Sequence, residues 1–411
     1  MQETSKYAVG IDIGTTKIRC VVGQIDIQTG VPTVVGVGEV VNTGMRKGTV
    51  VNLAGPSKAI DEALGEAERM SGYQVDSAAI SINGSHILST KADGMIAVTS
   101  VGNEVSEEDI IRVEEVATTG KVPANRTILD MIPFNYRLDG QDGIKDPIGM
   151  TGTRLEINAN VISALNPHVA NLEKSAEQAS VRPTSVVPSV VAASRAVLNE
   201  QQLENGVAVI DFGASTTGVA IYEEGELQYV SVIPIGSHNI TNDLAIGLKT
   251  DPEVAEQVKL KHASAVARSE NKEVIVKYEK EQFEFKTSDI DEIVEARLED
   301  IFEAINNELK KAGRKGKLPS GVVIVGGGSN LKKLVDYSKE ALELAVRKGK
   351  PSGFGGVADQ LSDARFAAAV GLMFSDMQPS SYDSPKSGRQ GADSNNTKSI
   401  ISRFFDRFRA S

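Results

Sequence analysis

One short segment, present twice in this chain, limits the possible folds more than any other feature of the sequence. Residues 9–16 read VGIDIGTT and residues 209–216 read VIDFGAST, so the two copies lie about 200 residues apart. In each copy an apolar strand ends at Asp-x-Gly, small hydroxyl residues follow, and a second strand begins. Both copies continue into a β-rich run and then a helical pattern. A repeat at this spacing predicts two related α/β lobes and argues against a short-period solenoid.

The chemistry of the repeated turn indicates a phosphate site. A tight turn at Asp-x-Gly directs several backbone N–H groups at one point, and glycine lets an anion approach the backbone closely. Two such turns facing each other can hold a polyphosphate, with Lys17 as a further donor. Asp12 and Asp211 are candidates to hold Mg²⁺ through water molecules, because Mg²⁺ gives up its water reluctantly. The candidate phosphate-binding residues are Gly14, Thr15, Thr16, Lys17, Gly213, Ala214, Ser215 and Thr216.

A third glycine-rich turn supports the same prediction. Residues 323–330 read VIVGGGSN, with a short apolar strand before the glycines and a helical pattern over 331–346. This order of strand, glycines and helix start is typical of nucleotide sites, and it adds Gly326, Gly327, Gly328 and Ser329 as candidates. A single Asp-x-Gly is more often an ordinary turn between strands. Two copies in matching contexts, together with the third turn, favour a nucleotide site.

These three motifs resemble those of the actin/Hsp70/hexokinase superfamily, whose fold is the duplicated, ribonuclease H-like one. The resemblance implies that the nucleotide is ATP, with Mg²⁺, and that the third turn contacts the adenosine. It also places a helix between the lobes, matched by residues 190–198. Members that hydrolyse ATP well tend to have Gln or Glu where this helix starts, whereas this chain has Ser189. We therefore expect at most weak ATPase activity, with Asp12 and Asp211 as the candidate catalytic residues.

Five further segments resemble the FtsA family of bacterial cell division proteins. They are residues 42–48 (NTGMRKG), 81–87 (SINGSHI), 104–110 (EVSEEDI), 144–156 (IKDPIGMTGTRLE) and 234–245 (PIGSHNITNDLA). The resemblance covers residues 5–376 and the tail, and it departs from the family at Ala214 and Ser237, where glycine is usual or frequent. Ala214 is expected to tighten or shift the second phosphate turn without abolishing it.

The resemblance implies the domain organisation. It predicts two lobes, a subdomain inserted in the first lobe, a small subdomain in the second, a linker and a membrane-targeting helix. The expected ranges are 1–84 and 167–203 for the first lobe, 85–166 for the inserted subdomain, 204–242 and 317–376 for the second lobe, 243–316 for the small subdomain, 377–397 for the linker and 398–411 for the helix.

The resemblance also implies a function. FtsA proteins bind ATP, polymerise at the inner face of the cytoplasmic membrane, and tether the tubulin-like protein FtsZ there during septum formation. In the small subdomain, Glu256 and Lys259 are expected to contact the ribose or base. Arg297 and Asp300, on a helix over 290–311, are candidates to bind the C-terminal peptide of FtsZ, although a solvated helix face explains either residue equally well. Downstream division proteins are expected on the inserted subdomain.

The C-terminal residues have the pattern of an interfacial helix. Residues 379–397 contain no Ile, Leu, Val, Phe or Met, which indicates a flexible linker. On a helix after the linker, five apolar side chains fall within an arc of about 140°, with basic residues beside it. The residues expected at an anionic membrane surface are Ile400, Ile401, Arg403, Phe404, Phe405, Arg407 and Phe408. The alternative is a terminal helix that docks on its own globular core, which would have no need of basic flanks.

Composition and alternatives narrow the function further. The formal net charge of −11 argues against nucleic-acid binding. A single cysteine, Cys20, forms no internal disulfide, and this fits a reducing cytosol. The polar N-terminus lacks a secretory signal, so we expect peripheral attachment on the cytoplasmic side of the membrane. The main alternative is the FtsA-like cytoplasmic component of type IV pilus assembly, and a sugar kinase is a third possibility that requires rapid phosphotransfer.

Overall fold

The first sheet contains the N-terminal copy of the repeated hairpin. The computed structural model describes residues 6–26, 29–356 and 361–377. Its first sheet has the strand order β11-β6-β1-β2-β3-β19. The strands are β1 (Lys6–Ile13), β2 (Lys17–Ile25), β3 (Pro32–Val41), β6 (Ser77–Ile82), β11 (Arg182–Pro188) and β19 (Gly355–Gly356). β1, β2 and β3 pair antiparallel, whereas β6 is parallel to both β1 and β11.

The second sheet repeats this plan. Its order is β14-β13-β12-β17-β18, from β12 (Val207–Phe212), β13 (Thr217–Glu223), β14 (Glu226–Ile233), β17 (Val322–Val325) and β18 (Val346–Lys348). β12, β13 and β14 form an antiparallel meander, as β1, β2 and β3 do. β17 is parallel to both β12 and β18. The matching order and directions confirm the predicted duplicated two-lobe α/β fold.

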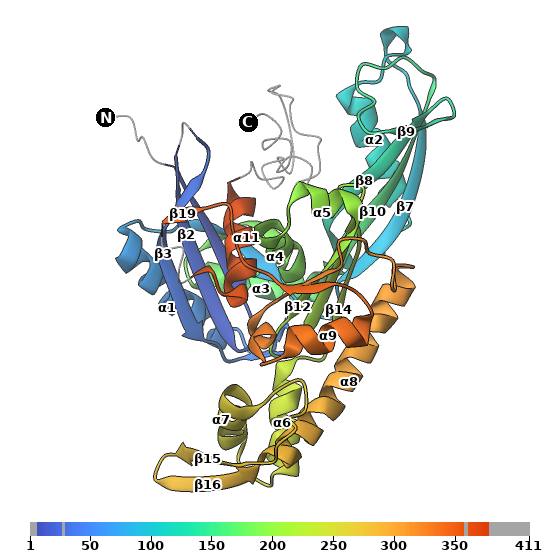
Figure 1. Cartoon of the computed structure of the whole chain (residues 1–411). Coiled ribbons are helices and arrows are strands. Elements are labelled where there is room, and N and C mark those ends of the chain that lie inside the picture. Colours follow the sequence, from blue (N-terminus) through green and yellow to red (C-terminus); the bar gives the residue numbers. More distant parts are fainter. Residues whose placement is uncertain (1–5, 27–28, 357–360, 378–411) are drawn as a thin grey trace.

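Two helices fill the space between the sheets, and they pack on each other. α4 (Ser189–Val197) follows the last long strand of the first sheet and packs on β12 and β13, whereas α11 (Ala367–Asp376) packs on β1 and β6. Figure 1 shows both helices between the two sheets. Glycine permits α11 to pack closely on α4 and on β1, because a Cβ at Gly371 would lie 1.7 Å from the carbonyl oxygen of Ala192, and one at Gly10 would lie 2.2 Å from that of Ala369.

The outer faces of both sheets are covered by other helices. α1 (Ala54–Ser71) packs on the first sheet opposite α11, and α3 (Asn166–Gln178) packs on α1 and β11. In β12, alternate residues enter different cores: Val209 faces the interlobe helices, and Ile210 faces α8 (Thr287–Lys311) and α9 (Leu334–Leu342). The short helix α5 (Glu200–Asn205) precedes β12. The order of layers is helix, sheet, helix, sheet, helix.

A separate four-stranded sheet is inserted between β6 and α3. It has the antiparallel order β7-β10-β8-β9, from β7 (Leu88–Ala97), β8 (Arg126–Leu138), β9 (Gln141–Ile144) and β10 (Arg154–Leu165), with α2 (Glu107–Thr118) on one face. Figure 1 shows this inserted subdomain projecting from the body. Its base reaches the edge of the second lobe, where the Asn160 amide donates to the carbonyl of Leu227 at 3.1 Å.

A second projection leaves the second lobe. It is formed by α6 (Ser237–Gly247), α7 (Pro252–His262), the hairpin of β15 (Glu273–Tyr278) and β16 (Glu281–Lys286), and the first part of α8, all at the bottom of Figure 1. The sequence-based boundary between residues 242 and 243 falls inside α6. A small pair of strands, β4 (Met45–Arg46) and β5 (Thr49–Val50), lies between β3 and α1.

Most of the elements expected from the sequence are present, with one clear error. The helix expected over residues 331–346 ends at Leu342, because Glu343 takes a left-handed conformation (φ 55°) and the chain then enters β18. A strand of only a few residues shows no alternation of its own in the sequence, so the helical pattern alone did not reveal where the helix ends. The linker and the amphipathic helix expected beyond residue 377 lie outside the described residues.

Candidate nucleotide site

The first hairpin turn is held in place by Asn42. The Gly14 N–H donates to the Lys17 carbonyl at 3.1 Å and closes the turn. The Asn42 side-chain amide donates to the Gly14 carbonyl at 2.7 Å, and its backbone N–H donates to the Thr16 carbonyl at 2.8 Å. Asn42 is 5% exposed, and its Oδ1 has no hydrogen-bond partner among the described residues. This buried acceptor beside the turn is suited to a donor brought by a ligand or its water.

The second hairpin turn is fixed in the same way by the start of α6. The Gly213 N–H donates to the Thr216 carbonyl at 3.0 Å. The backbone N–H groups of Ser237 and His238 donate to the carbonyls of Gly213 and Ala214, at 2.9 and 2.7 Å. A Cβ at Gly236 would lie 2.6 Å from the backbone carbonyl of Ala214, so glycine at position 236 lets the start of α6 pack closely against the turn. Thr216 is buried, whereas Gly213, Ala214 and Ser215 are partly exposed.

The third turn rests on the end of β12. Gly326 has φ 84°, and a Cβ there would lie 2.4 Å from Oδ1 of Asp211, while a Cβ at Gly328 would enter the ring of Phe212. Gly327 is exposed and has open space above its Cα, which makes it the glycine that a ligand can approach. Ser329 is buried, and its hydroxyl donates to the Gly326 carbonyl at 2.7 Å, so it shapes the turn.

The two repeated aspartates form an electrostatically coupled pair. Burial raises the pKa of Asp12, against the opposing effects of Arg19 and of a hydrogen bond from Ser81. Burial, and next the charge of Asp12, raise the pKa of Asp211 to about 7, although Arg19 acts to lower it. The Asp211 carboxyl therefore resists ionisation partly because Asp12 is nearby. The structure thus brings together the ends of β1 and β12, which are separate in the sequence.

This pair suits a divalent cation bound through water. Two close carboxylates have an excess of negative charge that a Mg²⁺ ion would offset, and Mg²⁺ in nucleotide sites commonly has one or two protein carboxylates, with phosphate and water completing its shell. Among the described residues there is no cluster of three or more His, Cys, Asp or Glu arranged to hold a metal. Asp12 and Asp211 are therefore the residues that would hold the ion, in the presence of phosphate oxygens.

In the described part of the chain, Arg19 and not Lys17 is the cation that pairs with Asp12. Arg19 lies opposite Asp12 on β2, with its guanidinium 3.9 Å from the Asp12 carboxylate. Lys17 instead pairs with Glu39 of β3 at 2.5 Å, and its side chain is 42% exposed. Burial alone would raise the pKa of Glu39, but Lys17 and Arg19 hold it below its usual value. Lys17 would have to leave Glu39 to reach a phosphate.

Glu256 and Lys259 connect to the second hairpin. On α7 they form an ion pair of 2.7 Å, and both contact the Thr241 hydroxyl of α6. The Lys259 ammonium also donates to the carbonyl of Ser237 at 3.3 Å, and the Ser237 N–H in turn donates to the Gly213 carbonyl. Hydrogen bonds through the start of α6 therefore link the small subdomain to the second turn. The side chain of Glu256 is 37% exposed and that of Lys259 is 11% exposed.

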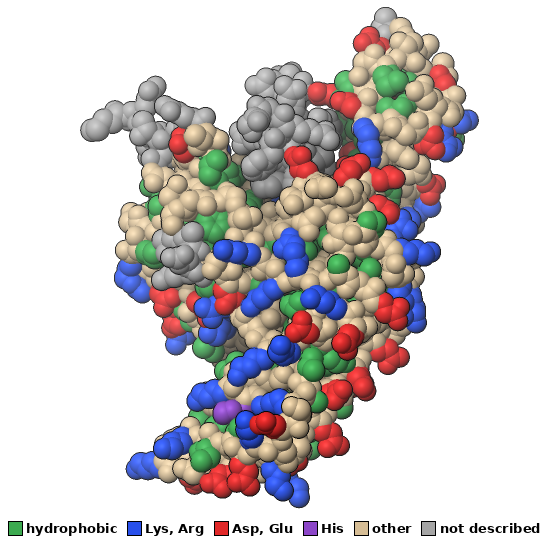
Figure 2. All heavy atoms as spheres, viewed as in Figure 1, with side chains coloured by type: hydrophobic (Ala, Val, Ile, Leu, Met, Phe, Trp, Pro, Cys, Tyr) green, Lys and Arg blue, Asp and Glu red, His purple; other side chains and the backbone are tan. Residues whose placement is uncertain are grey.

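Arg297 is already engaged within the small subdomain. Its guanidinium forms a two-pronged ion pair with Asp243 of α6, and it also contacts Asp300 at 2.9 Å. These contacts join α6 to α8 and leave the side chain of Asp300 59% exposed. Figure 2 shows acidic side chains gathered over α8. The exposed acidic residues of this helix include Glu292, Glu295, Glu299 and Glu303. The role of Arg297 and Asp300 in peptide binding stays a prediction.

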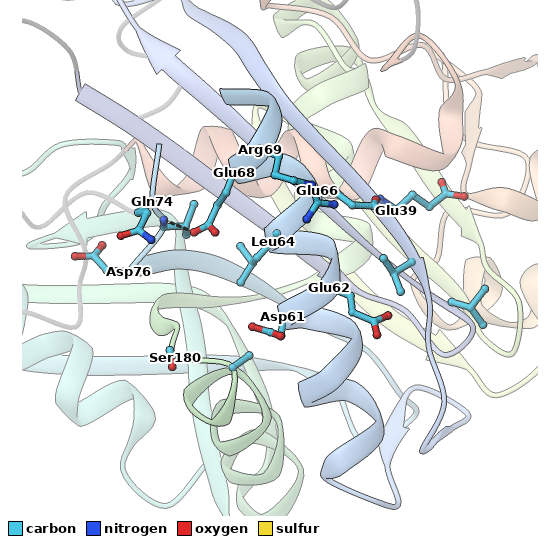
Figure 3. A pocket seen from close by; sticks show the side chains of 15 residues that line it. Glu39, Asp61, Glu62, Leu64, Glu66, Glu68, Arg69, Gln74, Asp76 and Ser180 are labelled. Carbon is cyan, nitrogen blue, oxygen red and sulfur yellow. Dashed lines mark hydrogen bonds between the residues drawn. The ribbon is translucent and has the colours of Figure 1, made fainter. Parts of the chain in front are cut away.

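A large hollow in the first lobe is separate from these turns. Its volume is about 1140 Å³, and it lies along α1, the end of β3 and the turn at Ala179–Ser180 (Figure 3). Carboxylates from Asp61, Glu62 and Asp76 surround it, which is the wrong charge for a polyphosphate. Glu68 lies there as well, and its carboxylate accepts from the backbone N–H of Val75 at 2.7 Å. The nucleotide turns do not line this hollow.

The sequence did not predict three residues that contact Asp12 or the first turn. Arg19 lies in a strand, and its position opposite Asp12 requires the pairing register of β1 and β2. Asn42 supports the first turn from 28 residues away. The Ser81 hydroxyl donates to Asp12 at 2.9 Å and accepts from the Ile13 N–H at 2.7 Å. Of the three, only Arg19 could have been placed from the sequence, because side chains alternate between the two faces of a strand such as β2.

The chain is similar to known cell division proteins over most of its length. The family model described as "Cell division protein FtsA" matches residues 208–371, and the model of the SHS2 domain inserted in FtsA matches residues 84–163. The FtsA protein of Pseudomonas aeruginosa is 32% identical over 383 residues, which cover 92% of this chain and 91% of that protein. The FtsA protein of Bacillus subtilis is 34% identical, covering 89% of this chain and 82% of that protein.

The chain belongs to the FtsA family. This confirms the resemblance drawn from the five motif segments, and the inserted subdomain corresponds to the SHS2 domain of FtsA. Among solved structures, a PilM–PilN complex of type IV pilus biogenesis is similar with a TM-score of 0.67 and 17% identity, covering 90% of this chain and 99% of that one. MreB5 of Spiroplasma citri bound to ADP has a TM-score of 0.54 and 11% identity, covering 89% and 94%. These structures show that the chain has the actin-like fold.

Proposed function

We propose that this protein binds Mg·ATP between its two hairpin turns and polymerises on the membrane, where it tethers FtsZ. The observation that carries the nucleotide proposal is the meeting of Asp12 and Asp211 beside two turns that are built alike. Gly327, with open space above it, and the unsatisfied acceptor of Asn42 support the same site. A structurally similar protein, MreB5, is described as bound to ADP.

Self-association is supported by the fold. One similar structure, with a TM-score of 0.50 and 15% identity, is described as a double helical filament of MamK. We propose that ATP favours assembly of this chain, and that Ser189 makes hydrolysis slow. Ser189 starts α4 and is 4% exposed, and its hydroxyl donates to the Ile82 carbonyl at 3.5 Å. A serine held in this way is a poor substitute for the longer Gln or Glu side chain that would position water.

Membrane attachment is proposed to come from the C-terminal residues. Within the described residues, no helix is both long and apolar enough to cross a bilayer. The basic and aromatic residues of 398–411 provide an amphipathic pattern, and one such segment binds lipid reversibly. Assembly would join several segments in one particle, so that attachment becomes firm by multivalency.

The test is reconstitution of the full chain with FtsZ and anionic vesicles. We expect FtsZ to sediment with the vesicles only when this protein and Mg·ATP are both present. A variant lacking residues 398–411 should bind the C-terminal peptide of FtsZ in a pull-down but fail to carry FtsZ to the vesicles. Unchanged vesicle binding by that variant would refute the membrane proposal.

The alternative is a role in type IV pilus assembly. The similarity to the PilM–PilN complex has a higher TM-score than the other neighbours described above, but at 17% identity it shows the fold alone. The relatives that are 30% or more identical over most of the chain are cell division proteins. Absence of FtsZ peptide binding in the pull-down would favour the pilus function.

A further inference from the structure

The first hairpin turn is connected to the base of the inserted subdomain through a short series of contacts. Thr15, in the turn, accepts a hydrogen bond through Oγ1 from the backbone N–H of Gly48 at 3.1 Å. Gly48 is buried and has φ 79°, at the tip of the small β4–β5 hairpin. A hydroxyl has one donor and two acceptor positions. Thr15 can therefore accept from Gly48 and still donate its proton to a ligand.

Gly48 is pressed against the chain that leads into the insert. A Cβ at Gly48 would lie 2.8 Å from the nitrogen of Gly84 and 2.9 Å from the carbonyl carbon of Asn83. Gly84 itself has φ 122°, and a Cβ there would lie 2.9 Å from the ring of His86. Backbone therefore meets backbone without intervening side chains. A displacement of the β4–β5 tip would be passed on to residues 83–84, because close-packed contacts do not absorb it.

His86 and Arg126 complete the connection. The His86 ring bonds through Nε2 to the Asn83 carbonyl at 3.1 Å and stacks on His168 of α3 with 4.3 Å between ring centroids. The backbone carbonyl of His86 accepts from the guanidinium of Arg126. Arg126 also donates to the hydroxyl and the carbonyl of Ser163, both at 2.9 Å. Arg126 begins β8 and Ser163 lies near the end of β10, so both central strands of the insert are reached.

We propose that the series Thr15, Gly48, Asn83–Gly84, His86 and Arg126 couples the first hairpin turn to the inserted subdomain, so that a ligand on the turn changes the stability of the insert's base. The ligand part rests on the proposed nucleotide binding, whereas the coupling itself is a property of the chain. Occupancy of the turn by phosphate orders Thr15, and through Gly48 it orders residues 83–86 and the base of β8 and β10. The coupling is reciprocal, because linkage between two sites acts equally in both directions.

The test is hydrogen–deuterium exchange of the full chain, without nucleotide, in four versions. Thr15→Val keeps the side-chain shape and removes the hydroxyl, Thr15→Ser restores it, and Thr16→Val removes the exposed neighbouring hydroxyl. Thr15→Val should speed exchange at residues 126–131 and 160–165 by about threefold to tenfold, the effect of losing one hydrogen bond. Thr15→Ser and Thr16→Val should match the wild type. Faster exchange confined to residues 45–50 in Thr15→Val would refute the coupling.

Reciprocity gives a second variant at the far end. Arg126→Met should speed exchange at residues 45–50 as well as in the insert, and an effect confined to the insert would contradict the proposal. In the nucleotide arm, Mg·ATP should slow exchange at residues 126–131 in the wild type and have no effect there in Thr15→Val. If isothermal titration shows that no nucleotide binds, the proposed function fails, and the ligand-free variants still decide the coupling. Binding without any change in the wild-type insert would overturn the ligand part.

Discussion

Arg19 lies directly across the first hairpin from Asp12, and its charge acts on both repeated aspartates. Its guanidinium is 3.9 Å from the Asp12 carboxylate, and it lowers the pKa of Asp211 as well as that of Asp12. The guanidinium also lies over the ring of Phe366, 5.6 Å from its centroid, at the start of α11. One side chain therefore joins the first hairpin, the aspartate pair and the interlobe helix.

We expect Arg19→Met to weaken Mg·ATP binding by about tenfold to a hundredfold, the usual effect of losing a charge-assisted contact. The loss follows because the two carboxylates would face a polyphosphate without this cation. Isothermal titration measures the change. Arg69→Met, an exposed arginine of α1 on the other face of the sheet, is the matched control and should bind as the wild type does. Equal affinity of both variants would remove Arg19 from the site.

Nucleotide affinity should depend on pH through Asp211. The pKa of Asp211 is raised to about 7, so below pH 7 the carboxyl is increasingly protonated and a cation must displace the proton. Affinity for Mg·ATP should therefore rise between pH 6 and pH 8. In Asp211→Asn the affinity should be weak and nearly constant over this range, whereas Asp61→Asn, an exposed residue of α1, should keep the wild-type slope. A wild-type affinity that is flat with pH would contradict this assignment.

The glycines of the third turn should respond differently to substitution. Gly326→Ala places a methyl group 2.4 Å from Asp211 on a residue with φ 84°, so we expect it to lower the free energy of unfolding by at least about 2 kcal/mol. Gly327→Ala places its methyl group in open space, so stability should change by less than about 0.5 kcal/mol while Mg·ATP binding weakens. Urea unfolding and titration separate the two effects. Equal destabilisation by both substitutions would argue against this geometry.

Stability should fall in mild acid because of His86. Burial, and next the charge of His168, lower the pKa of His86 to about 4, whereas the unfolded chain protonates a histidine near pH 6.5. The unfolded state therefore takes up a proton first, and the contribution of His86, complete above pH 6.5, is lost as pH falls toward 4. Between pH 7 and pH 5 the loss is about 2 kcal/mol. His86→Gln should lose correspondingly less in urea unfolding over this range, and an identical loss would contradict the assignment.

Much of the fold could be predicted from local patterns. The helix expected over 290–311 is α8 (Thr287–Lys311), which lies within a few residues of the expected bounds because its apolar side chains recur with a helical period. The two Asp-x-Gly turns were recognisable since their residue types are required by the turn itself. The end of α9 at Leu342 was missed, because a short buried strand after a helix has no period of its own.

The amino-acid sequence by itself determined the duplicated hairpins, the glycine turns and the family, since these depend on residues adjacent in the chain. Only the tertiary structure decided that Arg19 and not Lys17 pairs with Asp12, that Arg297 is held by Asp243, and that Gly48 contacts both the first turn and residues 83–84. These relationships depend on strand register and on packing between segments far apart in sequence. Local propensity contains no information about the distance between such segments, and packing sets it only when the whole chain has folded.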